Sequence, residues 1–182
     1  AMTRMASRVV LAESLQDSLR VVCEGTAEAL AVTLATVYLF DDRTGLASGA
    51  HLHGLPPGIV ARTVEREPTQ ALVAKYGTLA QFPDIRDVPE LPHRERMIGN
   101  GARSLAYAAL TAEGEFLGVL AVATFGDDVR RFDAEEMELL RTGADLVASS
   151  LIRERHAERN AMILRTMSEG VVLADAQRVI LY

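Results

Sequence analysis

The chain has 182 residues, of which 49% are hydrophobic and 24% are charged, and it carries a net charge of −6 at pH 7. This composition is typical of one globular domain with short appendages, and the acidic balance argues against a nucleic-acid-binding surface. The single cysteine, Cys23, excludes an internal disulfide, a dithiol redox enzyme and a cysteine-rich zinc site. Because no apolar run has the length of a membrane span and no signal peptide is evident, we expect a cytoplasmic protein with no membrane partner.

The first third of the chain predicts a helix followed by a β-hairpin. Apolar residues recur every three or four positions across residues 8–34, a spacing that is typical of one amphipathic helix. Residues 37–40 are rich in β-forming side chains, and the turn-forming segment 41–45 separates them from a second strand at residues 46–52.

The middle third predicts only short elements, because proline and glycine interrupt it repeatedly. A helix at residues 59–66 is expected to end at Glu67 and Pro68, and a second helix at residues 69–76 is expected to end at Gly77. The remaining elements are a brief strand at residues 79–82, a proline-rich loop at 83–89 and one short helix within 90–101.

Two apolar runs, at residues 105–110 and 116–125, predict a central β-hairpin with Gly114 in the tight turn between them. Neither run alternates between apolar and polar side chains, so we expect both faces of these strands to be covered. The runs are rich in alanine and glycine, which leave room on at least one face of the sheet. Either a helix packs unusually close there, or the space belongs to a ligand.

The last helix is expected to begin after Asp133, whose side chain can accept hydrogen bonds from the free amides of the first helical turn. Apolar residues then recur at helical spacing as far as Ile152. Residues 153–159 are nearly all charged, so we expect the helix to leave the globular part there and to continue to about Thr166.

The order of these parts resembles that of a GAF domain, a small-molecule-binding sensory module of cytoplasmic signalling proteins. The resemblance covers about residues 15–152. It rests on the strands at 37–41 and 46–52, on His53-Gly54-Leu55-Pro56, on Pro83-Asp84-Ile85-Arg86-Asp87, on Leu117-Gly118-Val119-Leu120, and on Phe132-Asp133 before the last helix. It implies an α+β fold, in which a central antiparallel sheet carries the N- and C-terminal helices on one face and a ligand pocket on the other. We assign residues 8–152 to this domain and residues 153–166 to a helical linker.

Departures from the patterns of that family disfavour several of its ligands. Asn100 is followed by Gly101, and Phe132 by Asp133, so the pattern associated with cyclic-nucleotide binding is missing. Cys23 lies on the first helix, whereas a bilin held through a thioether needs a cysteine near the pocket. One cysteine is also too few for the members that reduce methionine sulfoxide. We therefore predict no cofactor and no enzymatic activity.

Residues 163–182 resemble the beginning of a PAS domain. Residues 170–175 and 179–182 are similar to its first strand and turn, with Arg178 near a position where glycine is common. We assign residues 167–182 to the start of a truncated PAS domain, and we expect strands at residues 170–173 and 179–182. With no sheet of their own to join, they are expected to be either mobile or paired with another chain, and we favour pairing.

The residues that we predict for the ligand pocket are aromatic and apolar side chains with a few polar groups. They are Tyr38, Phe40, His51, His53, Tyr76, Phe82, Asp84, Ile85, Ile98 and Tyr107. Half of this set is equally compatible with plain core. Strand parity is undefined when both faces are buried, so Tyr38 and Phe40 can also point at the helices.

Metal binding and catalysis are the alternatives for the polar members of this set. His51 and His53 are two positions apart on a strand, so both can point to one face as a metal pair requires, but no third ligand stands at a suitable spacing. Asp84 and Asp87 can form a carboxylate pair, but aspartates in such a loop ordinarily bond their own backbone. We predict no metal site and no catalytic residue.

The leading hypothesis is a non-enzymatic sensor that binds an unknown small molecule. It relays a conformational change through its last helix to a PAS domain and to an output such as a kinase, a cyclase or a transcription activator in the same chain. The alternative is a dimerisation scaffold whose pocket is filled by its own side chains. We also expect a homodimer, because the apolar stripes of the two terminal helices exceed what one sheet can bury. These stripes include Leu15, Leu19, Val22, Leu140, Val147 and Leu151.

Overall fold

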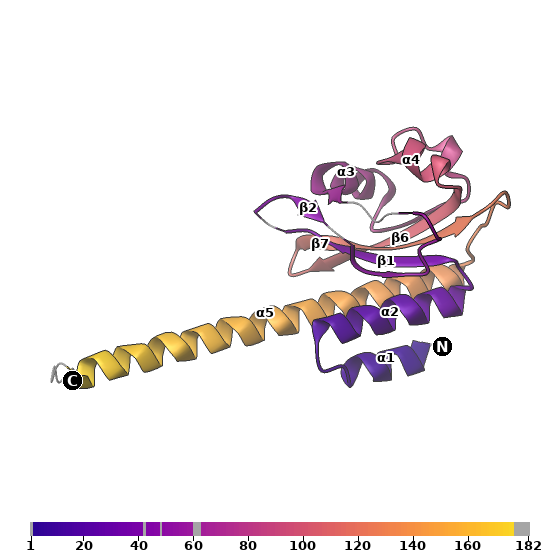
Figure 1. Ribbon diagram of the computed structural model, residues 1–182. Coiled ribbons are helices and arrows are strands. Elements are labelled where there is room, and N and C mark those ends of the chain that lie inside the picture. Colours follow the sequence, from indigo (N-terminus) through magenta and orange to yellow (C-terminus); the bar gives the residue numbers. More distant parts are fainter. Residues whose placement is uncertain (1, 42, 48, 60–62, 177–182) are drawn as a thin grey trace.

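The computed structural model describes residues 2–41, 43–47, 49–59 and 63–176, which form three layers (Figure 1). A five-stranded antiparallel sheet is the middle layer. One face is covered by helices α2 (Leu15–Leu30) and α5 (Ala134–Ala176), and α1 (Met2–Val10) packs on the outer side of these two helices. Over the other face lie α3 (Arg66–Tyr76), the short 3-10 helix η1 (Ile85–Asp87), α4 (Arg94–Gly99), and a small ladder of β2 (Leu46–Ala47) and β4 (Val64–Glu65). The predicted α+β class, with the terminal helices on one face of an antiparallel sheet, is confirmed.

The strands of the sheet follow the order β3-β1-β7-β6-β5. They are β1 (Leu34–Leu39), β3 (Gly49–His53), β5 (Leu79–Phe82), β6 (Ala102–Ala112) and β7 (Glu115–Phe125). β6 and β7 form the predicted central hairpin, and β5 coincides with the predicted strand at residues 79–82. The two turn residues of the hairpin, Glu113 and Gly114, have φ angles of 53° and 83°, a backbone conformation that favours glycine.

The N-terminal region contains two helices, so the prediction of one helix over residues 8–34 is wrong. α1 ends at Val10 and α2 begins at Leu15. The Ser14 side chain caps α2 by accepting a hydrogen bond from the Asp17 amide at 3.1 Å. Because both helices bury one face in the same core, the apolar spacing continues across the break and hides it. Only the cap at Ser14 marks the boundary.

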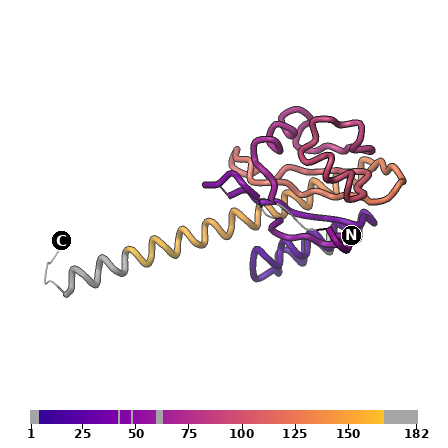
Figure 2. Tube along the Cα trace, turned by 45° about the horizontal axis from the view of Figure 1, so that its top comes forward, coloured from indigo at the N-terminus to yellow at the C-terminus, as the bar shows by residue number. Residues whose placement is uncertain are grey.

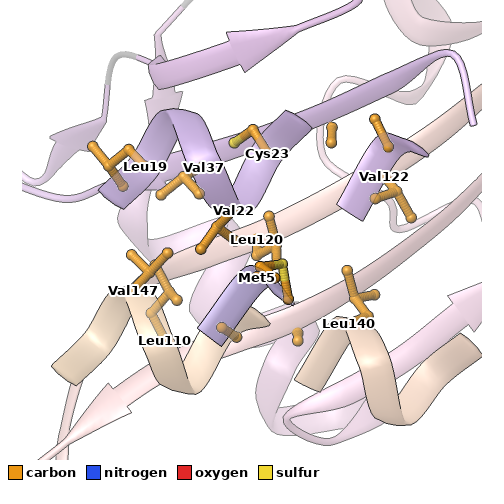
Figure 3. Close-up of a cluster of buried hydrophobic side chains, with 14 of the residues drawn as sticks. Met5, Leu19, Val22, Cys23, Val37, Leu110, Leu120, Val122, Leu140 and Val147 are labelled. Atoms are coloured by element: carbon orange, nitrogen blue, oxygen red, sulfur yellow. The ribbon is translucent and has the colours of Figure 1, made fainter. Parts of the chain in front are cut away.

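The main core lies between the helical layer and the sheet (Figure 3). Its fully buried members include Leu19, Val22, Leu120, Leu140 and Val147. Burial of such a side chain stabilises a fold by about 1.5–3 kcal/mol. α5 approaches the sheet closely at Gly143, where an added Cβ atom would lie only 2.9 Å from Leu120 Cδ2. The absence of a side chain at this position is therefore part of the helix–sheet packing.

The region before α3 departs from its prediction. Val64 and Glu65 form β4, which pairs with β2, where a helix over residues 59–66 was expected; residues 60–62 lie outside the described part of the chain. Pro68 lies in the first turn of α3 instead of ending a helix, because amides of a first turn have no partner within the helix. The predicted stop at Gly77 is confirmed by its φ of 91° and by its amide, which bonds to the Val73 carbonyl at 2.8 Å.

The C-terminal helix α5 leaves the globular part and extends far beyond it (Figures 1 and 2). The predicted cap is confirmed, because the Asp133 side chain accepts from the Glu136 amide and the Glu136 side chain accepts from the Asp133 amide, both at 2.9 Å. The helix has 43 residues, which corresponds to a length of about 65 Å. Within the described ranges, no helix combines the length and the hydrophobicity needed to cross a membrane.

The strand predicted at residues 170–173 is wrong, because these residues continue α5 to Ala176. Each residue added to an existing helix gains a backbone hydrogen bond, whereas a lone strand has no partner for its amides and carbonyls. The second predicted strand, at residues 179–182, lies outside the described residues. The division at residues 152 and 166 into a domain, a linker and a PAS segment stays a prediction.

Candidate ligand-binding site

A cavity of about 180 Å³ lies between the sheet and the layer of short helices. Its floor comes from β1, β6 and β7, whereas its walls and mouth come from α3, α4 and the segments next to them. It therefore lies on the face of the sheet opposite α2 and α5 (Figure 1).

Strand parity decides which side chains of β1 reach the cavity. Leu34, Thr36 and Tyr38 line it, while Ala35 and Val37 between them are buried in the core under the helices. Successive side chains of a strand point to opposite faces, so one short strand serves both layers.

The small residues of the central hairpin are divided between the two faces. Ala121 and Ala123 of β7 line the floor of the cavity. Ala106 and Ala108 of β6 belong to the core on the helical side. The expected close approach of a helix therefore applies on one face, and open space lies over the other face.

Three hydroxyl groups of the cavity lining already make hydrogen bonds within the protein. Thr36 donates to the His51 carbonyl at 3.1 Å, Thr69 donates to the Glu65 carbonyl at 2.9 Å, and Tyr107 donates to the Gly77 carbonyl at 2.9 Å. Burial raises the pKa of Tyr107 to about 12, so its hydroxyl remains a donor at any ordinary pH. These groups hold strands and helices in place around the cavity.

The polar mouth of the cavity is formed by His93, Arg96 and Asn100, which are all exposed. The neighbouring Arg94 anchors α4, because its guanidinium donates to the carbonyls of Ile85 at 3.2 Å and Arg86 at 2.6 Å. By contrast, the guanidinium of Arg96 makes no hydrogen bond or ion pair with the residues that the structure describes. It is available to a molecule in the cavity.

The charge of Arg96 affects two titratable groups near the mouth. Burial raises the pKa of the Tyr38 hydroxyl, and this effect outweighs the lowering by Thr36 and Arg96. Burial lowers the pKa of the His93 imidazole, and the Arg96 charge lowers it further. Tyr38 therefore stays protonated at neutral pH and keeps a hydroxyl that can donate.

Two of the ten residues predicted for the pocket, Tyr38 and Tyr107, line this cavity. Phe40 does not, because it lies beyond the end of β1 and packs elsewhere. Its ring centroid is 5.5 Å from that of Phe116 and 5.7 Å from the guanidinium carbon of Arg66.

Three more of the predicted residues belong to a second core beside the cavity, and a fourth, Tyr76, is exposed and touches this core through Phe82. Phe82 and Ile85 are buried in it, and Ile98 packs against it. The Tyr76 ring meets the Phe82 ring edge-on at 5.0 Å, and its hydroxyl bonds to Glu90. These side chains support the roof, although none of them lines the cavity.

His51 and His53 share one face of β3, as predicted, but it is the helical face. They pair with Val37 and Ala35, which are both buried under the helices. Burial is the main cause that lowers the pKa of His51, with Glu24 of α2 acting in the opposite direction. The two imidazoles therefore lie at the edge of the sheet, away from the cavity.

Asp84 lies outside the cavity and has a structural role. Its carboxylate accepts from the Arg86 amide at 3.0 Å, which caps η1, and forms ion pairs with Arg103 at 3.0 Å and Arg86 at 3.1 Å. The expectation that this loop uses its aspartate to bond its own backbone is confirmed. Among the described residues, no three His, Cys, Asp or Glu side chains are grouped as a metal site requires.

The polar mouth was missed by the sequence-based selection, although the spacing contained a signal. Arg96, Met97 and Asn100 follow His93 at offsets of three, four and seven positions, a spacing that places the four side chains on one face of a helix. Ile98 is the residue of this segment that was predicted for the pocket instead. That residue points to the second core.

Comparisons with known proteins agree on the fold. A family model described as "GAF domain" matches residues 14–151. The GAF domain of a phosphoenolpyruvate-protein phosphotransferase from Coxiella burnetii has a TM-score of 0.73 and 20% identity, over 87% of this chain and 94% of that one. The PixJ GAF domain of Thermosynechococcus elongatus, in its blue-light absorbing form, has a TM-score of 0.69 and 18% identity, over 84% of this chain and 93% of that one.

A third structure is the chromophore-binding domain of a bacteriophytochrome from R. palustris, with a TM-score of 0.70 and 13% identity. The match covers 86% of this chain but only 61% of that one. At these identities the three structures show a shared fold and nothing finer. No curated protein matches the chain.

Proposed function

The chain belongs to the GAF domain family, and from this premise we propose that it is a non-enzymatic sensory domain that binds a small molecule in the cavity. Occupancy of the cavity changes the sheet, and α5 carries this change to a following PAS domain and an output domain in the same chain. GAF domains are generally regulatory or sensory modules, which supports this assignment.

The observation that carries the proposal is that the cavity and the helical layer share the same strands. On β7, Ala121 faces the cavity, while Leu120 and Val122 on either side of it are fully buried under the helices. A ligand that displaces this strand also displaces residues on which α5 packs, because close-packed interiors transmit small shifts. α5 then leaves the domain, so it is the element through which such a shift reaches another domain.

A ligand in this cavity is held without a covalent bond to cysteine. Cys23 is fully buried on α2, on the opposite face of the sheet (Figure 3). Burial raises the pKa of its thiol to about 12, which leaves it unreactive. One of the similar structures is a chromophore-binding domain. In the present chain, a ligand in the cavity cannot reach the buried Cys23, so covalent attachment through this cysteine is sterically blocked.

The scaffold alternative is disfavoured by the cavity itself. A scaffold without a ligand would fill the space with its own side chains, as natural cores ordinarily do. Here alanines occupy the floor, and the side chains leave about 180 Å³.

We also propose a homodimer, on a different surface from the one expected. Leu19, Val22, Leu140 and Val147 are buried within the single chain, and α1 packs over the outer side of α2 and α5. Among the described residues of the terminal helices and their ends, large apolar side chains are exposed at Val10 and Leu11, where α1 ends, and at Met162, Ile163 and Leu164 on the extended part of α5. Pairing along the extended part of α5 would cover the last three. Light scattering that shows only monomer at micromolar concentration contradicts the proposal.

Native mass spectrometry tests ligand binding by the cavity. The wild-type chain is incubated with small organic acids, amines and alcohols, beside Ala121→Phe, which fills the floor, and Ala161→Phe, a matched control on exposed α5. We expect one-to-one adducts with the wild type and the control that are lost in Ala121→Phe. Equal adducts in all three proteins, or none from the whole panel, contradict the proposal and favour the scaffold.

A further inference from the structure

The cavity has two chemically different ends. Its floor is apolar and includes Val119, Ala121, Ala123 and Phe125 of β7. Its mouth is polar and exposed at His93, Arg96 and Asn100. A molecule that satisfies both ends has a hydrocarbon part and a hydrogen-bonding head.

The charge of the mouth selects the head group. None of the described lining residues is acidic, whereas Arg96 carries a permanent positive charge and His93 can acquire one. Neighbouring arginines are committed to the protein: Arg94 bonds to two backbone carbonyls, and Arg103 pairs with Asp84. Arg96 alone of these three has a guanidinium that no described residue engages. Arginine binds carboxylates through two parallel hydrogen bonds, so its natural complement here is an anion.

The size of the cavity limits the hydrocarbon part. A cavity of roughly 150 Å³ holds one benzene molecule. The present volume of about 180 Å³ therefore suits one ring or a chain of similar bulk.

We infer that the cavity takes a small organic acid with a single ring or a comparable carbon chain. Its carboxylate binds Arg96, with Asn100 and the Tyr38 hydroxyl as further donors, and its hydrocarbon part packs on the alanine floor. This inference rests on the proposed function and names the class of its ligand.

Calorimetric titration with four matched probes tests the class of head group. Benzoate, benzamide and benzylamine differ in charge on one ring, and acetate supplies the carboxylate without the ring. We expect benzoate to bind about tenfold more tightly than benzamide, in keeping with one charge-assisted contact, and both benzylamine and acetate to bind more weakly than benzamide. If benzamide or benzylamine binds as tightly as benzoate, the inference fails while the proposed sensor stands. If no probe binds and the native mass spectra show no adduct, the proposed function fails as well.

A pair of charge-matched variants tests the role of Arg96. Arg96→Gln is expected to weaken benzoate binding about tenfold and to leave benzamide binding unchanged, since only the acid uses the charge. Arg131→Gln removes the same charge from an exposed position outside the cavity lining and is expected to bind benzoate like the wild type. Unchanged benzoate binding by Arg96→Gln, with cooperative unfolding retained, overturns the inference.

Discussion

The two faces of the central sheet are built from the same strands, but they differ in how completely their side chains are packed. On the helical face, Leu120 and Val122 are fully buried against α2 and α5. On the cavity face, the neighbouring Ala121 and Ala123 border open space. Fold stability is therefore concentrated on the helical side, because free energy follows apolar burial. The cavity side is left free to meet a ligand.

The largest difference between the faces is expected from one leucine on each side. Leu120→Ala removes a fully buried side chain from the helical core and should cost about 2–5 kcal/mol of unfolding free energy. Leu105→Ala removes a partly buried side chain at the cavity and should cost about 1–2 kcal/mol. Urea denaturation of both variants measures the two values. Equal costs would break the distinction between the faces.

Two glycines allow the two faces to be compared by the cost in stability of adding a Cβ atom. A Cβ atom on Gly118 would lie 2.0 Å from the Tyr38 carbonyl oxygen and 3.2 Å from Leu110 Cδ1, so Gly118→Ala should cost about 1–3 kcal/mol or more. Gly99, at the end of α4 on the cavity side, has nothing within 4 Å of an added Cβ. Gly99→Ala should therefore be neutral or slightly stabilising. Thermal unfolding of both variants is the measurement, and a loss in Gly99→Ala equal to that in Gly118→Ala contradicts the account.

Stability should also fall modestly in mild acid, through one histidine on each face. Burial lowers the pKa of His51 on the helical face and of His93 at the cavity mouth, both from 6.5. The unfolded chain therefore binds protons more readily than the folded chain. The contribution of these histidines to the unfolding free energy is complete above pH 6.5, and it is lost as the pH falls from 6.5 through their lower pKa values in the folded state. Urea midpoints measured from pH 7.5 to 5 should show this decline, and His51→Gln and His93→Gln should each flatten it. A decline that neither variant alters contradicts this assignment.

The smallest effect on stability is expected at the cavity mouth. Arg96 is exposed and makes no hydrogen bond or ion pair with the described residues, so Arg96→Gln should change the unfolding free energy by less than about 0.5 kcal/mol. A matched change at Arg94, which holds two backbone carbonyls, should cost more. Urea denaturation of Arg94→Gln and Arg96→Gln measures the loss of unfolding free energy in each variant. A larger loss in Arg96→Gln than in Arg94→Gln would contradict the claim that Arg96 does not stabilise the fold.

The fold was more accessible from the sequence than the site was. Glycine at 114 and the cap at Asp133 act locally, so the central hairpin and the start of α5 could be predicted from neighbouring residues. The side chains around the cavity depend on strand parity, which continuous apolar runs such as 116–125 do not reveal. His51 illustrates the difference, since its pairing with Val37 turns it toward the helices. The register that decides this is a tertiary property.

Residues 170–173 show where local sequence propensity fails as a predictor of secondary structure. Their β propensity favoured a strand, but the helix that enters them from Ala134 continues to Ala176. Local propensity is a weak guide where no partner strand is at hand and an existing helix can be extended.

Hydrogen exchange with and without saturating benzoate tests the central claim most directly, namely that the cavity face and the helical face are coupled through shared strands. The account predicts slower exchange not only in α3 and α4 but also in β7 and in residues 134–152 of α5, and no change in Ala121→Phe. Protection confined to α3 and α4 while benzoate is bound, with exchange in α5 unaltered, would contradict it.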